Sequence, residues 1–157
     1  GADSTVVEEF LEIVLENVYP DQNRLWKRSF YQNSFLLSAD NGHAVHPNHP
    51  EKTDPTNRPY LNGGVVLKYN GSQKYTTDGY SAAIVRQICN TWEIPLQIFA
   101  NRSDIAGGST LGNISTAHVS IPSADVGLAQ LAMHSAFETA GVKDTEALAQ
   151  LAEHLFA

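Results

Sequence analysis

Cysteine and long apolar runs are what this 157-residue sequence most clearly lacks. Cys89 is its single cysteine, so no internal disulfide can form. A chain without disulfides is typical of reducing compartments, and we expect a cytoplasmic setting. A membrane-spanning helix needs about 20 consecutive apolar residues, and no run approaches that length. The sequence therefore predicts neither a membrane anchor nor, from its opening residues, a signal peptide.

Basic residues are also scarce. Ten Lys and Arg stand against 17 Asp and Glu, which gives a net charge of −7, and no basic stripe appears. Nucleic acid is therefore not an expected partner. The sequence begins at Gly1 without an initiator Met, so we expect a processed chain or a piece of a longer protein.

The sequence does contain enough apolar residues for a core, at 42% of the total, and its length suits one domain. Hydrophobic periodicity predicts helices at 6–18, from 77 or 78 to just before Pro95, and near the carboxyl terminus, with a short helix or turn within 21–32. Strands are expected at 35–40, 65–70, 96–101 and 118–121, and 73–76 is a candidate continuation of the sheet. Alternating strands and helices predict an α/β fold, a layered sheet, mostly parallel or mixed, flanked by helices.

The helix patterns also predict caps and buried sides. Thr5 and Glu8 fit a capping box at the first helix, whose apolar side, including Phe10, is expected to lie on the core. Asp144 or Thr145 is the expected N-cap of the last helix. The expected apolar side of the middle helix comprises Tyr80, Ile84, Ile88 and Trp92.

One loop concentrates side chains that bind metals. Asp40 ends an apolar run, and His43, His46 and His49 follow it closely. Carboxylate and imidazole suit zinc, cobalt or manganese. The loop from 41 to 64 is long, and long loops in compact domains are often functional. For any single histidine, the alternative is a surface residue that only forms hydrogen bonds.

These residues belong to a recognisable pattern. Ser-Ala-Asp at 38–40 and His-Ala-Val-His-Pro-Asn at 43–48 resemble the motif of the aspartyl aminopeptidase family of dinuclear metallopeptidases. Four further segments agree with that family in order, and they lie at 57–59, 63–68, 108–112 and 128–135. The resemblance covers nearly the whole chain.

The resemblance implies roles for five residues. Asp40 would be a ligand of one metal ion and His134 a ligand of the other. Asp40, His43, Lys68 and Tyr75 would bind the substrate, with Lys68 facing the acidic side chain of the amino-terminal residue. The implied cofactors are two divalent ions, zinc with cobalt or manganese as alternatives, which activate a hydroxide for peptide hydrolysis.

The same resemblance implies that part of the active site lies elsewhere. The family's general-base Glu and its other ligands have no counterpart here, and residues 1–5 resemble the segment just after its Glu-Glu pair. We therefore expect residues 1–157 to be the carboxyl-terminal part of a catalytic domain, without the inserted dimerisation domain and inactive alone. Implied partners are peptides, the upstream half of the polypeptide and, at full length, further copies. Ala106 and Gly107 replace a Pro-Cys pair of some members, which leaves acidic or neutral specificity open.

Alternatives remain at the level of the sequence. The chain could be a folded piece or assembly subunit without a complete metal site, or a different metal-dependent hydrolase on the same sheet. Lys68 alternates with apolar residues on its strand, and its other interpretation is an edge-strand lysine that discourages sheet pairing.

Overall fold

The computed structural model describes all of residues 1–157. Its helices are α1 (Val6–Val18), α2 (Arg24–Gln32), α3 (Gly79–Thr91), α4 (Leu111–Thr116) and α5 (Val142–Phe156), with a short 3₁₀ turn η1 (Pro50–Lys52). Its strands are β1 (Leu36–Ala39), β2 (Gly42–His43), β3 (Val65–Tyr69), β4 (Leu96–Ala100), β5 (Ser123–Gly127), β6 (Ala129–Leu131) and β7 (Thr139–Ala140). None of the helices is long and apolar enough to cross a membrane.

The main sheet has the strand order β1-β5-β3-β4. β1 runs parallel to β5 and β3 runs parallel to β4, whereas β3 and β5 are antiparallel. A smaller sheet has the strand order β2-β6-β7, and its strands β2 and β6 follow β1 and β5 in the chain. The predicted α/β class with a mixed sheet is confirmed.

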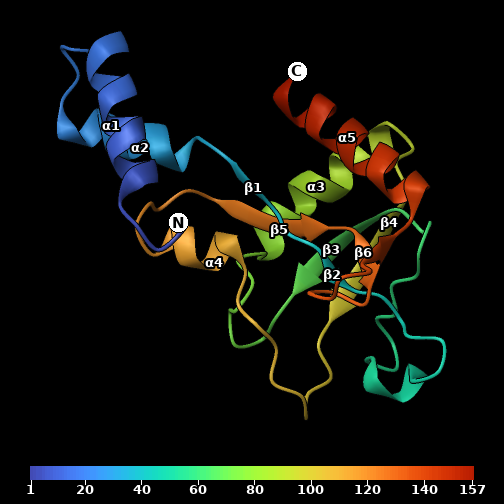
Figure 1. Ribbon diagram of the computed structural model, residues 1–157. Helices are drawn as coiled ribbons and strands as arrows, with labels where there is room; N and C mark the ends of the chain where they lie inside the picture. Colours follow the sequence, from blue (N-terminus) through green and yellow to red (C-terminus); the bar gives the residue numbers. More distant parts are fainter.

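Strand β3 separates two layers, because successive side chains point to opposite faces. Val65 and Leu67 join an apolar core formed with α3 and α5, and both helices lie together on that side in Figure 1. Val66 points to the other face and packs with Tyr75 and Phe99. Lys68 lies on that second face, where the site described below is built.

Two of the predicted strands are wrong. Residues 118–121 are irregular, and the strand that enters the sheet is β5, directly after Pro122. Residues 73–76 form turns, because the Asn70 side chain accepts hydrogen bonds from the backbone N–H groups of Ser72 (2.9 Å) and Lys74 (3.4 Å). Both errors fall where turn geometry and distant pairing decide the structure.

The helix starts follow the predictions in part. Thr5 is the N-cap of α1, but its hydroxyl donates to Glu9 at 2.6 Å and forms no capping box. Asp78 caps α3 in a reciprocal box with Ser81. Asp144 is not an N-cap, because Gly141 holds that place. The buried Asp144 carboxylate instead accepts from two backbone N–H groups of the loop before β3, those of Asn62 and Gly64, both at 2.7 Å.

The buried sides of two helices differ from expectation. In α3 the buried residues are Ser81, Ala82, Val85 and Cys89. Tyr80 and Trp92, on the side predicted to be buried, are exposed. In α1 only Leu15 is buried, and Phe10 is 64% exposed.

The reason lies in the position of α1. It packs with α2 through the rings of Tyr19 and Trp26, 4.8 Å apart, and through the ion pair of Lys27 with Glu16 at 3.1 Å. Figure 1 shows the two helices at one end of the molecule, away from α3 and α5. Within α2, Trp26 stacks on Phe30, with ring centroids 5.6 Å apart.

Candidate active site

A cavity of about 310 Å³ opens beside the second face of the main sheet. All five residues singled out from the sequence line it: Asp40, His43, Lys68, Tyr75 and His134. They come from the end of β1, from β2, from β3, from the loop after β3 and from the turn after β6. Segments far apart in the sequence thus meet at one site.

Asp40 is fixed by its backbone. Its N–H donates to the carbonyl oxygen of Val126 at 2.9 Å, so the chain stays on the sheet one residue beyond β1. A Cβ on Gly127 would lie 2.0 Å from the Asp40 carbonyl oxygen, so only glycine permits this approach. The next side chain, Asn41, accepts from the N–H of Leu128 at 3.1 Å. The Asp40 carboxylate is therefore held at the rim of the cavity.

Lys68 is buried, with 1% of its surface exposed, and β3 has neighbours on both sides. The edge-strand interpretation is therefore wrong. The ammonium is not free either: Nζ donates to the Asp40 carbonyl oxygen at 2.6 Å and lies 5.2 Å from the centre of the Tyr75 ring. Burial lowers the pKa of Lys68, and the negative charges of Asp40 and Asp125 partly oppose this. A second, longer hydrogen bond reaches the Asn41 carbonyl oxygen at 3.5 Å. An ammonium has three donors, so one donor remains for a ligand in the cavity.

Tyr75 forms a wall beside this ammonium. Burial raises the pKa of the Tyr75 phenol, although the hydrogen bond from Asn101 Nδ2 at 3.2 Å acts in the opposite direction. Asn101 also lines the cavity, and sequence reasoning missed its role. The available signal was its place directly after β4, the strand parallel to β3.

His134 lies in a tight turn after β6. Both Ala132 (φ 54°) and His134 (φ 66°) adopt left-handed backbone conformations. Such conformations are uncommon for residues other than glycine and gather at functional sites. The His134 N–H donates to the Glu138 carboxylate at 2.5 Å, which fixes the turn and leaves the exposed imidazole at the cavity.

A second missed residue is Asp125, fully buried in β5. Its Oδ2 accepts from the backbone N–H of Thr76 at 2.6 Å and from the Thr76 hydroxyl at 3.0 Å. Its Oδ1 has no hydrogen-bond partner. The carboxylate holds the segment after Tyr75 and adds negative charge near Lys68. A lone acidic residue between Ala124 and Val126 was the signal in the sequence.

The two remaining loop histidines do not join Asp40. His46 Nδ1 accepts from the N–H of Asn48 at 3.2 Å, and His49 Nδ1 lies 3.2 Å from the Glu51 carboxylate. Both line a neighbouring cavity instead. Nowhere in residues 1–157 do three or more His, Cys, Asp or Glu side chains gather as a group that could hold a metal ion. The expected association of Asp40 with three imidazoles is not present.

Residues 1–156 match the family model of the aminopeptidase I zinc metalloproteases, M18. The chain belongs to this family. A probable M18 family aminopeptidase 2 of Clostridium novyi is 44% identical over 144 residues, which cover 92% of this chain and 33% of the relative. The chain thus spans about a third of the length of the curated relatives it matches.

Solved structures of the family share the fold. The crystal structure of yeast aminopeptidase 1 matches with a TM-score of 0.86 and 26% identity, over 99% of this chain and 34% of that chain. The S. cerevisiae mApe1 dodecamer gives a TM-score of 0.84 and 25% identity, with 99% and 34% covered. The predicted family and the α/β sheet flanked by helices are confirmed.

The donors at the cavity fit the zinc of this family in kind. Zinc in catalytic sites takes three protein ligands, drawn from imidazole, carboxylate and thiolate. Asp40 and His134 offer one carboxylate and one imidazole at the same cavity. They fit part of such a site.

Proposed function

We propose that this chain contributes to the active site of a metal-dependent aminopeptidase that removes acidic amino-terminal residues, Asp or Glu, from peptides. The observation that carries the proposal is the buried Lys68 ammonium, which lines the same cavity as Asp40 and His134. The charges of Asp40 and Asp125 offset only part of the cost of burying this cation, and a substrate carboxylate would offset more of it. Membership of the M18 family supplies the reaction class.

Lys68 gives the cavity its selectivity in this proposal. The carbonyl oxygens of Asp40 and Asn41 hold Nζ in a fixed direction, and the remaining donor is available to a substrate carboxylate. Low dielectric strengthens such a charge-assisted contact. His43 and Tyr75 form the walls that orient the substrate and exclude water around it.

Asp40 and His134 would hold metal at this cavity, with Asp40 also facing the substrate. A bound zinc ion polarises the scissile carbonyl group and lowers the pKa of water. We propose two divalent ions, zinc with cobalt or manganese as alternatives. One carboxylate and one imidazole cannot complete two sites, so the other ligands and the general base would come from a further part of the catalytic domain, and the chain alone would be inactive.

The partners follow from the same proposal. The substrates are peptides, and the working form is a homo-oligomer, which the likeness to the mApe1 dodecamer supports. A cytoplasmic setting remains a prediction from the single cysteine. The catalytic domain would extend beyond these 157 residues, in line with the third of its relatives' length that the chain spans.

Metal content tests the proposal directly. In a protein that joins this chain to the rest of its catalytic domain, Asp40→Ala and His134→Ala should each lose bound metal by elemental analysis. Activity should fall by more than about 100-fold, because removing even an outer partner of a metal ligand costs 10–100-fold. Asp21→Ala and His154→Ala, away from the cavity, are the matched controls. Unchanged metal content in both site variants would show that the ligands lie elsewhere, as in the non-enzymatic alternative.

A further inference from the structure

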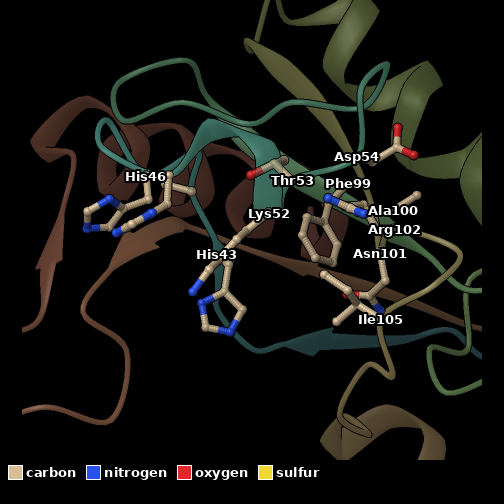
Figure 2. A pocket seen from close by; sticks show the side chains of 12 residues that line it. His43, His46, Lys52, Thr53, Asp54, Phe99, Ala100, Asn101, Arg102 and Ile105 are labelled. Carbon is tan, nitrogen blue, oxygen red and sulfur yellow. The ribbon is translucent and has the colours of Figure 1, made fainter.

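A second cavity of about 480 Å³ adjoins the site. The two cavities share four lining residues: His43, Phe99, Asn101 and Ile105. Figure 2 shows the second cavity, with the Phe99 ring between the loop that carries the histidines and the segment after β4. Its volume falls within the range of roughly 300–1,000 Å³ that is usual for ligand pockets. A ligand held in the first cavity can therefore continue into the second past His43.

The lining of this second cavity is cationic. Lys52 and Arg102 line it, and Asp54 is the single acidic residue. The Asp54 Oδ1 already accepts three hydrogen bonds, from the N–H of Thr56 (2.9 Å) and from the N–H (2.7 Å) and side-chain amide (3.0 Å) of Asn57. These bonds hold the Asp54 carboxylate in its own turn, where it forms no ion pair with Lys52.

Arg102 is engaged as well. Its Nε and Nη2 donate to the two oxygens of Asp104 at 2.8 and 2.5 Å, and Nη1 donates to the carbonyl oxygen of Glu51. The hydrogen bond to Glu51 connects η1 to the segment just after β4. Arg102 is thus a positioning residue for the turn that carries Lys52, rather than a free cation.

The Lys52 side chain has no hydrogen bond and no ion pair within the chain, and no hydrogen bond engages the His43 imidazole. In Figure 2 both side chains extend in the same direction from the loop. The cavity therefore holds an ammonium without a hydrogen bond beside an imidazole, and neither Asp54 nor Glu51 forms an ion pair with this ammonium. An anionic group on a ligand would complete this arrangement.

We propose that the second cavity binds a carboxylate on the part of the peptide that follows the scissile bond, with Lys52 and His43 as its contacts. The inference rests on the proposed aminopeptidase function and adds a preference on the leaving side of the substrate. The carboxylate can come from an acidic side chain at the second residue or from the free carboxyl terminus of a dipeptide. Both sources present the same chemistry to Lys52.

Kinetics can separate the two sources. The dipeptide substrates share one amino-terminal residue and differ in the second. Comparing Glu-amide with Gln-amide at the second position tests the side chain. Comparing Gln with a free carboxyl terminus and Gln-amide at that position tests the terminus. In the complete peptidase, the wild type should prefer at least one carboxylate form. Lys52→Met should reduce that preference about three- to tenfold, mainly through KM, since a partly exposed charge pair is worth about 1 kcal/mol. Lys143→Met, an exposed lysine on α5, should leave it unchanged.

Binding to the 157-residue chain gives a readout without turnover. Titration of the ¹⁵N-labelled chain with the Glu-amide and Gln-amide peptides should shift the His43 and Lys52 side-chain resonances more strongly for Glu. The difference should vanish in Lys52→Met. Equal shifts for both peptides, together with an unchanged substrate preference in an active Lys52→Met enzyme, would overturn the inference and leave the proposed function intact. Selective binding with no peptidase activity in the complete protein would instead remove the proposed function and keep a carboxylate site.

Discussion

Both faces of the main sheet bury side chains, but only one of them buries charged groups beside its apolar residues. On one face Val65 and Leu67 of β3 lie fully buried beneath α3 and α5. On the other, Lys68 of the same strand and Asp125 of its neighbour are just as buried. Burial of the apolar pair stabilises the fold, whereas burial of the charged pair is unfavourable by itself. Burial alone therefore does not mark a core, and a site is recognised by what kind of group is buried.

The largest effect on stability is expected on the helix-covered face. Leu67→Ala should lower the free energy of unfolding by about 2–5 kcal/mol, because it removes apolar contacts and leaves a cavity in a packed core. Chemical unfolding measures the loss. Leu25→Ala, at a side chain 75% exposed on α2, is the control and should change stability by less than about 0.5 kcal/mol. A similar, small loss in both variants would show that the face beneath α3 and α5 is not a packed core.

Lys68→Met probes the opposite face and should behave differently. Met keeps the aliphatic stem and removes the buried charge, so the part of the pH dependence of stability that Lys68 contributes should disappear in the variant. The effect depends on pH in a defined direction. Burial lowers the folded-state pKa of Lys68, so between that pKa and the ordinary value of 10.5 the unfolded state binds more protons. Wild-type stability therefore gains a contribution as pH rises through this window.

Unfolding curves of wild type and Lys68→Met over that alkaline window test the sign. Groups that titrate there and lie away from Lys68 cancel in the difference between the two proteins. The stability of the wild type should rise relative to that of the variant. Parallel curves would mean that the Lys68 ammonium is as well solvated as in the unfolded chain.

A smaller loss is expected at the start of α3. Asp78→Ala breaks the reciprocal capping box with Ser81 and should cost about 1 kcal/mol. The exposed Asp21→Ala serves as the control. Because Asp78 does not line the cavity, the preference between acidic and neutral substrates should not move. A change in preference would show that α3 helps to shape the site.

The sequence predicted the helices and strands whose own residues show a clear hydrophobic period. The alternation in β3 placed Lys68 opposite Val65 and Leu67, and helical spacing predicted both α1 and α5. The start of α5 lies at Val142, before the predicted cap. The sequence could not show which neighbour covers a face. The apolar side of α5 buries Leu151, whereas the apolar side of α1 leaves Phe10 exposed. Burial of a helix face depends on the packing of distant segments, which periodicity does not contain.

The family resemblance predicted some residues of the site, and the others could not be predicted. The motif resemblance identified Asp40 and His134, which the fold brings to one cavity from positions far apart in the chain. It could not show that His46 and His49 turn away, because spacing in a loop says little about direction. Strand β5 was missed because it owes its place to pairing with β1 and β3. Asp125 was missed with it.

We propose above all that Lys68 binds an acidic side chain of the substrate, and substrate preference tests this role most directly. In the complete peptidase, kcat/KM is measured for aspartyl and leucyl substrates with wild type and Lys68→Met. A charge-assisted contact is worth roughly 1.5–3 kcal/mol, so the aspartyl-to-leucyl ratio should fall about 10- to 100-fold while the leucyl rate changes little. The same ratio in both proteins would contradict the assignment of Lys68 to the substrate.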